Sequence, residues 1–309
     1  MYKKGKQYAE DFAMLKKKIP ILCAVILTAV LGAVYNAGET QEENNDFKAA
    51  EKNVTESADL TPNGEQNLNF DINAADEKYY SLSANHIGWG FKKNKGAPPD
   101  IDKKTIELFG KTNTYYMASG DEKAMYLTFD EGYENGCTAS ILDILKEKDV
   151  KAAFFITGHY LKSEQELVRR MIDEGHIVGN HTMKHPNLAK SDLSTAAAEL
   201  KALDDEYSAI FGGHMIYMRP PEGEYSERLL TFASDMGYKT VLWSFAYRDW
   251  ERDVRKGADY AYSQIVPYFH SGAIILLHAV SADNAEALGA VIDAAREQGY
   301  VFKSLDELN

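Results

Sequence analysis

Cysteine is scarce in this chain of 309 residues, which contains only Cys23 and Cys137. Cys23 lies in an apolar run near the amino terminus and Cys137 lies far along the chain, so no disulfide framework can staple a small fold. Cys23 follows Leu22 and not a small residue, which argues against a lipid-attachment site. The fold therefore depends on a hydrophobic core, for which 45% hydrophobic residues are sufficient material.

Positive charge is also in short supply. The chain has 34 basic residues against 47 acidic ones, a formal net charge of −13. A nucleic acid is not an expected partner, because binding its phosphates requires a cationic face. The charge is unevenly spread: residues 1–18 contain six lysines and two carboxylates, whereas residues 36–77 contain eleven carboxylates and two lysines.

One long apolar run without charged residues spans residues 19–35 and directly follows three consecutive lysines. This pattern is typical of a membrane-targeting segment. The ring of Tyr35 stands where a small-x-small cleavage site would need a small residue, which favours a transmembrane helix over a cleaved signal segment. The lysines predict that residues 1–18 form a cytoplasmic stub. We therefore expect a single-pass protein of the cell membrane with everything after residue 36 outside the cytoplasm, and a cleaved secreted form as the alternative.

Aromatic residues and a steady apolar period are nearly absent from residues 36–77. This segment cannot bury enough apolar surface to offset its chain entropy, so we predict an acidic disordered linker. The remaining residues, 78–309, are predicted to form one domain, with its characteristic motifs between residues 123 and 302.

From Ala124 onward, short apolar runs alternate with amphipathic stretches. Strands are predicted at residues 124–129, 152–157, 177–179, 216–218, 240–245 and 273–277, and helices at residues 139–148, 164–174, 194–210, 227–236, 259–269 and 284–297. This alternation favours an α/β domain with a parallel sheet covered by helices. The pattern alone leaves open whether the sheet is open or closed into a barrel.

Polar side chains follow several of these strands, and in such domains the loops after the carboxyl ends of the strands build the site. Asp130 and Glu131 end the first strand, where two carboxylates can divide the work of metal binding and proton abstraction. His181 and His185 follow another strand. On a helical turn their spacing places both rings on one side, within reach of one zinc-like ion.

Three further polar groups follow the later strands. Residues 219–223 read Arg-Pro-Pro-Glu-Gly, Asp249 and Trp250 follow the next strand, and His278 ends the last one. An arginine can keep a carboxylate ionised, an aspartate can orient an imidazole, and a histidine can protonate a leaving amine.

The order and spacing of these five motifs closely resemble the polysaccharide deacetylase family, also called the NodB-homology family, over residues 123–302. The resemblance implies a distorted (β/α) barrel and a hydrolase that removes acetyl groups from sugars with a divalent metal, for which zinc is the expected ion. By the same resemblance, the catalytic residues are Asp130 as general base with Arg219 as its partner, and His278 as general acid with Asp249 as its partner. The implied metal ligands are His181, His185 and Glu131. The implied substrate contacts are Trp250, as a wall of the groove, and Pro221, Glu222 and Gly223, where a backbone N–H serves as oxyanion donor.

A narrower resemblance to the delta-lactam-biosynthetic de-N-acetylases of spore-forming bacteria rests on four stretches of sequence. These stretches are residues 88–93, 129–136, 157–159 and 280–287. The resemblance implies peptidoglycan glycan strands as the partner, and loss of the acetyl group from a peptide-free N-acetylmuramic acid on the way to muramic delta-lactam in the spore cortex. His159 belongs to this pattern, but we expect only a structural role for it.

Two residues depart from the family pattern. Glu131 stands where family members usually have aspartate, and Glu222 stands where many have tyrosine. Two alternatives therefore stay open: a deacetylase of another N-acetylglucosamine polymer, and a catalytically impaired wall-binding module.

Overall fold

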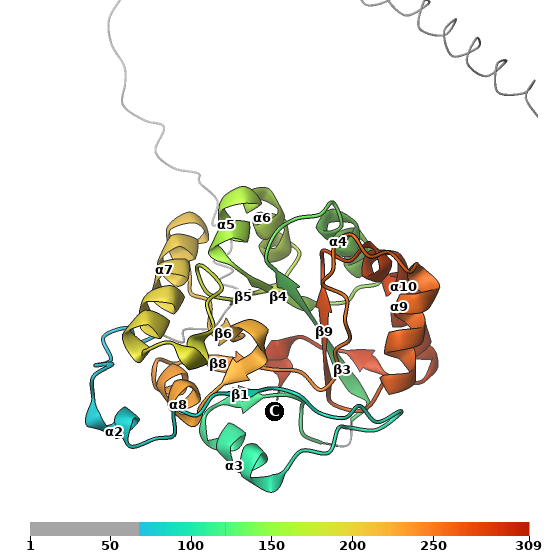
Figure 1. Cartoon of the computed structure of the whole chain (residues 1–309). Helices are drawn as coiled ribbons and strands as arrows, with labels where there is room; N and C mark the ends of the chain where they lie inside the picture. The colour runs from blue at the N-terminus through green and yellow to red at the C-terminus, as the bar shows by residue number, and fades with distance from the viewer. Residues whose placement is uncertain (1–67, 121, 309) are drawn as a thin grey trace, which may run out of the picture. The chain divides into compact units, whose positions relative to one another are not determined.

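The computed structural model describes residues 68–120 and 122–308, in which strands and helices alternate as the sequence predicts (Figure 1). The strands are β1 (Ile87–Gly88), β2 (Thr114–Tyr115), β3 (Ala124–Glu131), β4 (Ala152–Ile156), β5 (Ile177–Asn180), β6 (Tyr217–Met218), β7 (Glu224–Tyr225), β8 (Lys239–Val241), β9 (Ala273–His278) and β10 (Val301–Phe302). The α-helices are α2 (Glu77–Tyr80), α3 (Lys103–Lys111), α4 (Thr138–Glu147), α5 (Gly158–Ser163), α6 (Gln165–Asp173), α7 (Leu193–Phe211), α8 (Glu227–Asp235), α9 (Ala258–Ile265) and α10 (Ala282–Glu297). The predicted α/β class is confirmed.

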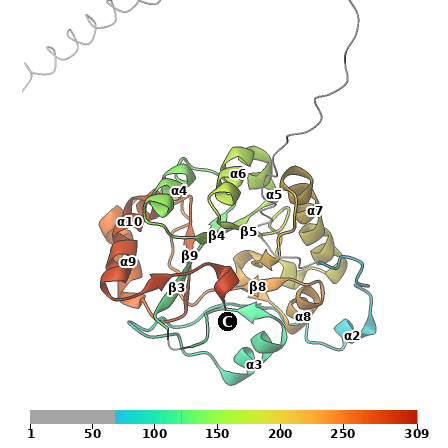
Figure 2. The same ribbon diagram turned by 180° about the vertical axis from the view of Figure 1, so that it is seen from behind.

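An eight-stranded parallel sheet lies at the centre of the domain. Its strands follow the order β10-β3-β4-β5-β6-β8-β2, and β9 also pairs with β3. Isolated bridges to β9 from Met117 and Phe245, which follow β2 and β8, bring opposite edges of the sheet together. Because these contacts are isolated bridges and not continuous ladders, the sheet is a half-barrel, and the helices lie around it in both opposite views (Figures 1 and 2).

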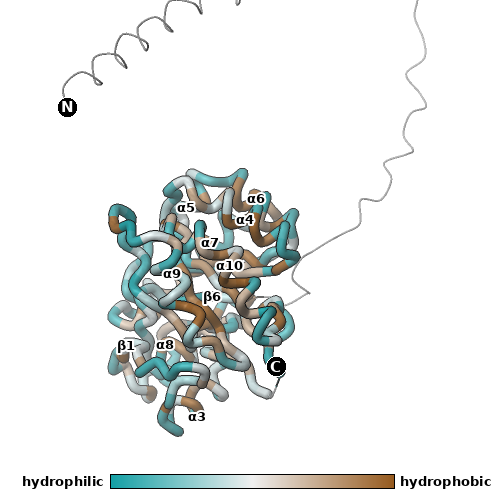
Figure 3. Tube along the Cα trace, turned by 90° about the vertical axis from the view of Figure 1, so that its right-hand side faces the viewer, coloured by the Kyte–Doolittle hydropathy of each residue, from teal (hydrophilic) through white to brown (hydrophobic). Residues whose placement is uncertain are grey.

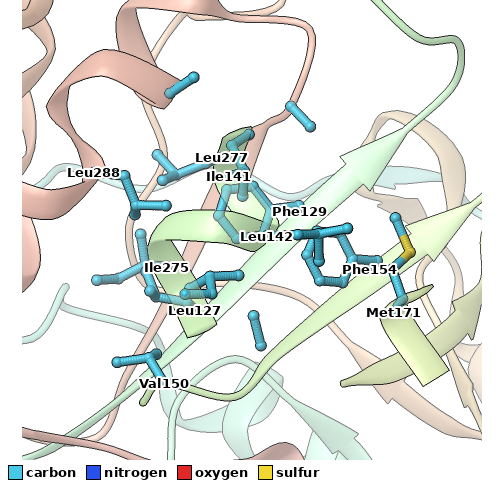
Figure 4. Packing of buried hydrophobic residues seen from close by; sticks show 14 of the residues in the cluster. Leu127, Phe129, Ile141, Leu142, Val150, Phe154, Met171, Ile275, Leu277 and Leu288 are labelled. Atoms are coloured by element: carbon cyan, nitrogen blue, oxygen red, sulfur yellow. The ribbon is translucent and has the colours of Figure 1, made fainter. Parts of the chain in front are cut away.

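The largest hydrophobic cluster lies between the sheet and the helices that cover it. Strand β3 is buried along its whole length, and its Leu127 and Phe129 pack with Ile141 and Leu142 of α4 (Figure 4). Phe129 also stacks on Phe154 of β4, with 5.1 Å between the ring centroids. Apolar stretches gather inside the domain and polar ones on its peripheral loops (Figure 3).

The last ten residues of the predicted linker, residues 68–77, belong to the domain. Leu68, Phe70 and Ile72 are partly buried against the cluster formed by α7 and α8, and the N–H of Asn69 donates to the carbonyl at the end of α8 at 2.8 Å. Because the apolar side chains recur at every second position, one side of this extended segment is apolar. The predicted domain boundary at residue 78 is therefore too late.

One predicted helix is divided, and another is confirmed but has an unpredicted short helix before it. The stretch predicted as a helix at 259–269 is α9 followed by a 3-10 turn at Val266–Tyr268, because Pro267 has no N–H to continue the helix. The helix predicted at 164–174 is preceded by the separate short helix α5.

The predicted transmembrane segment, residues 19–35, and residues 36–67 of the predicted linker lie outside the described residues. Within the ranges 68–120 and 122–308, no helix combines the length and the apolar character needed to span a membrane.

Replacing Leu142 with alanine tests the core beneath α4. Leu142 is fully buried, so we expect the free energy of unfolding to fall by about 2–5 kcal/mol in a urea titration. Glu147→Ala, an exposed position on the same helix, should change it by no more than about 0.5 kcal/mol. Equal losses in the two variants would contradict the proposed packing.

Candidate active site

The carboxyl ends of four parallel strands bring the predicted site residues to one end of the sheet. Asp130 of β3 and His278 of β9 are register partners. Strands β5 and β6 pair at Asn180, whose carbonyl accepts the N–H of Arg219 at 3.0 Å. His181 follows Asn180, so it lies beside Arg219 at the same end of the sheet.

The Arg219 side chain is fully buried and holds Asp130 from inside the sheet. Its Nη1 donates to Asp130 Oδ1 at 2.7 Å, its Nη2 to the Thr128 hydroxyl at 2.8 Å, and its Nε to the Val241 carbonyl at 2.9 Å. Burial raises the pKa of Asp130, but the positive charge of Arg219 opposes this effect. The net pKa of Asp130 lies below its ordinary value. Asp130 is therefore an ionised carboxylate suited to accept a proton.

The two predicted histidine ligands are brought together. The His181 and His185 ring centroids are 4.8 Å apart. Their segment is a turn in which Thr182 and His185 have φ values of 70° and 58°, and the N–H of His185 donates to the Thr182 hydroxyl at 2.9 Å. The spacing thus presents both rings as predicted, but on a left-handed turn and not on a helical one.

His181 is held as a neutral imidazole. Its Nδ1 lies 2.8 Å from the Arg219 carbonyl oxygen, which can only accept, so Nδ1 carries the proton and Nε2 keeps its lone pair. Burial lowers the pKa of His181 to about 4 despite the nearby charge of Asp130. This tautomer leaves Nε2 available to a metal ion, in the manner of metal-binding histidines with a fixed second nitrogen.

Glu131, the predicted third ligand, is not placed with the histidines. Successive side chains of a strand point to opposite faces, so Glu131 points toward α4 when Asp130 points into the site. There the Thr138 hydroxyl donates to Glu131 Oε1 at 3.3 Å, and Oε2 has no hydrogen-bond partner among the described residues. Burial and the charge of Glu134 raise the pKa of Glu131 well above its usual range, which favours a neutral acid.

The predicted set of three metal ligands therefore does not fit a metal ion as the chain places it. Within residues 68–120 and 122–308, no three His, Cys, Asp or Glu side chains are grouped to hold one. His181 and His185 suit two nitrogen positions. The carboxylate oxygen that does lie beside His181 belongs to Asp130, whose Oδ2 is 3.6 Å from His181 Nε2.

His278 and Asp249 form the second predicted pair. His278 Nδ1 lies 2.7 Å from Asp249 Oδ1, and the backbone N–H of His278 donates to Asp249 Oδ2 at 2.9 Å. Burial lowers the pKa of His278, but the charge of Asp249 and its hydrogen bond raise it more, so the net pKa lies above the ordinary value. His278 is thereby favoured as a protonated imidazolium. The Trp250 ring, about half exposed, lies 5.7 Å from the His278 ring between centroids.

The predicted oxyanion turn is a tight turn at Pro221–Gly223. Glu222 and Gly223 have φ values of 61° and 65°. A Cβ on residue 223 would lie 2.5 Å from the Trp243 ring, so only glycine fits there. The exposed Glu222 carboxylate accepts from Asn187 Nδ2 at 2.9 Å.

Two buried polar residues at the site have no role in the sequence prediction. Thr128 lies two positions before Asp130, and strand alternation alone could have placed it on the same face. Asn284 donates to Asp249 from the first turn of α10. No separate sequence signal marked it, because the first turn of α10 also contains the polar Asp283.

A carboxylate with a lowered pKa and a histidine with a raised pKa, at the carboxyl end of a parallel half-barrel, are suited to acid–base hydrolysis. Comparisons with known proteins agree with this class. The sequence profile described as polysaccharide deacetylase matches residues 118–241. The chain is 45% identical over 224 residues to the peptidoglycan-N-acetylmuramic acid deacetylase PdaA of Bacillus subtilis, covering 72% of this chain and 85% of that protein. It is 35% identical over 219 residues to a chitooligosaccharide deacetylase of Bradyrhizobium, covering 66% of this chain and 98% of that protein.

Solved structures show the same likeness. The structure of B. subtilis PdaA, a family 4 carbohydrate esterase, matches with a TM-score of 0.71 at 44% identity, covering 74% of this chain and 98% of that one. A family 4 carbohydrate esterase from Bacillus anthracis matches with a TM-score of 0.62 at 42% identity, covering 74% and 97%. The chain belongs to the polysaccharide deacetylase family, a family of hydrolases, as its motifs predict.

Arg219→Met tests the buried ion pair. The variant leaves the Asp130 carboxylate buried without its partner, so the free energy of unfolding should fall by about 3–5 kcal/mol in a urea titration at neutral pH. Adding Asp130→Asn removes the stranded charge and should recover part of this loss. A double variant no more stable than Arg219→Met would contradict the role of the pair.

Proposed function

We propose that this protein removes the acetyl group from N-acetylmuramic acid in peptidoglycan glycan strands, toward the muramic delta-lactam of the spore cortex. The likeness to B. subtilis PdaA supports the substrate. The chemistry rests mainly on one observation: Asp130 and His278 are register partners at the site, and each is held by its own buried polar partner.

The roles follow from the two environments. Asp130 accepts a proton from a water molecule, and the resulting hydroxide adds to the carbonyl carbon of the acetyl group. A backbone N–H of the turn at Pro221–Gly223 donates to the oxyanion. His278 then gives its proton to the amide nitrogen, the carbon–nitrogen bond breaks, and the products are acetate and a free amine. Trp250 forms a wall of the groove, where its exposed ring packs on a sugar face.

A divalent metal, with zinc as the expected ion, belongs to this proposal. His181 and His185 would hold it, because their rings adjoin and His181 Nε2 keeps its lone pair. When bound, the metal supplies Lewis-acid polarisation of the carbonyl. The remaining protein ligand stays unassigned, since Glu131 lies on the other face of β3.

The proposed location is the outer face of the cell membrane. Residues 19–35 would anchor the chain as a single-pass helix, and residues 1–18 would stay in the cytoplasm. The apolar run after three lysines supports this location, and cleavage of that segment would yield a secreted form instead.

Asp130→Asn and His278→Ala test the assigned roles. Each variant removes one proton-transfer group, so kcat for acetate release from peptide-free muramoyl glycan should fall by about 10²–10⁴-fold. Circular dichroism should show an unchanged fold. His159→Ala, an exposed histidine on α5, is the matched control and should keep full activity. Full activity in either site variant would overturn its assignment.

Metal removal tests the proposed cofactor and the impaired-module alternative together. Dialysis of the full chain against a chelator should abolish acetate release, and added zinc should restore it, because the adjoining rings of His181 and His185 would hold the metal. The double variant His181→Ala, His185→Ala should lose metal by elemental analysis. Undiminished release in chelator would contradict metal dependence. A wild-type chain that releases no acetate with any added divalent metal would favour the impaired module.

A second candidate is deacetylation of another N-acetylglucosamine polymer, which the chitooligosaccharide deacetylase relative favours. Acetate release from matched concentrations of muramoyl glycan and chitooligosaccharide separates the two. A higher kcat/KM on chitooligosaccharide would replace the leading proposal.

A further inference from the structure

We propose that Asn284 is a positioning residue for the general acid His278. It acts through Asp249, in a hydrogen-bond chain that runs from Tyr247 through Asn284 and Asp249 to His278. This inference rests on the proposed function, in which His278 protonates the leaving amine. It assigns a chemical role to the first turn of α10, which lies outside the five motifs.

The contacts of Asn284 connect the chain. Its Nδ2 donates to Asp249 Oδ2 at 2.6 Å and also lies 3.3 Å from the carbonyl oxygen of His278. The Tyr247 hydroxyl donates to Asn284 Oδ1. Asn284 is 2% exposed, Asp249 7% and Tyr247 8%, so water has little access to compete for these bonds.

The chemistry of the neighbours fixes the orientation of the Asn284 amide. The Asp249 carboxylate can only accept, so the Nδ2 group must face it and Oδ1 must face the Tyr247 hydroxyl. The backbone of Asn284 is fixed as well, because its N–H donates to the hydroxyl of Ser281, the N-cap of α10. Asn284 is therefore a preorganised donor aimed at one oxygen of Asp249.

Asp249 is fully committed between Asn284 and His278. Its Oδ1 meets His278 Nδ1, and its Oδ2 accepts from the His278 backbone N–H and from Asn284. The Asn284 bond stops the carboxylate from turning away from the imidazole. It also stabilises the ionised form of Asp249, which in turn stabilises the protonated form of His278. Without this donor, the pKa of His278 should fall.

Other charged groups lie near His278 or beside Asn284. Asp130 of β3 favours its protonated form and Arg219 after β6 opposes it. Asp283, the neighbour of Asn284, accepts from the Lys256 N–H at 2.7 Å and from Arg255 at 3.3 Å. Replacement of Asn284 leaves the charges of Asp130, Arg219 and Asp283 in place. A change in the pKa of His278 therefore reports on the Asn284–Asp249 bond.

The test is Asn284→Ala in the full chain. Carbon-detected NMR titration of labelled histidines gives the pKa of His278, with Asp249→Asn as the reference for complete loss of the carboxylate. We expect the His278 pKa to fall in Asn284→Ala, and the alkaline limb of the kcat profile to move to lower pH with it. At neutral pH, kcat should fall about tenfold, with KM changed by less than about twofold.

A matched control separates positioning from stability. Asn135 also donates its side-chain amide to a backbone carbonyl near the site, that of Val280, at 2.9 Å, but it has no bond to Asp249. Asn135→Ala should leave the His278 pKa unchanged. An unchanged His278 pKa in folded Asn284→Ala would overturn the inference, whatever its stability.

Tyr247→Phe supplies a second route to the same answer. It removes the hydroxyl that fixes the Asn284 amide, so the His278 pKa should shift in the same direction by a smaller amount. If Asn284→Ala does not fold, this variant decides: a lowered pKa supports the inference and an unchanged pKa overturns it. The titration needs no substrate, so a wild-type chain that releases no acetate would overturn the proposed function while the titration still decides this inference.

Discussion

The buried contact between Arg219 and Asp130 is the interaction on which the rest of the site depends. The guanidinium bonds to two residues of β3 and to the carbonyl of Val241, the last residue of β8, so one side chain from the end of β6 ties three strands together. The backbone carbonyl of Arg219 also fixes the tautomer of His181. A buried guanidinium is costly unless it is paired. The contacts that satisfy it therefore also fix the proton acceptor and one histidine in the same place.

In the second pair of the site, the carboxylate acts on its partner, whereas in the first pair the partner acts on the carboxylate. Asp130 is held by a cation that lowers its pKa, whereas Asp249 holds a histidine and raises the pKa of that histidine. Both carboxylates are buried, so burial alone does not separate their roles. The partner of each one does: an arginine that cannot lose its proton leaves Asp130 as the base, and an imidazole that can lose one makes His278 the acid.

Much of this site follows from the sequence, because the carboxyl ends of parallel strands meet. Asp130, His181, Arg219, Asp249 and His278 were all expected at one edge, and the structure places them there. Glu131 shows the limit of such reasoning: adjacency in sequence suggested a shared site, but alternation along β3 turns its side chain toward α4.

Other features cannot be read from local sequence. The turn at His185 depends on positive φ values at non-glycine residues, which no local sequence pattern predicts. Asn284 was missed because its role exists only once α10 packs beside the loop of Asp249. Residues 68–77 were missed because three alternating apolar side chains are too few to stand out in an acidic stretch.

The pH dependence of kcat for acetate release from peptide-free muramoyl glycan tests the central claim most directly, namely that the partners of two buried carboxylates assign the acid and the base. If Asp249 keeps His278 protonated, the rate should fall on the alkaline side with a pKa above 6.5, the ordinary value for histidine, and Asp249→Asn should move that limb to lower pH. A rate that stays level or keeps rising on the alkaline side would contradict the account. So would an alkaline limb at the same pH in Asp249→Asn as in the wild-type chain.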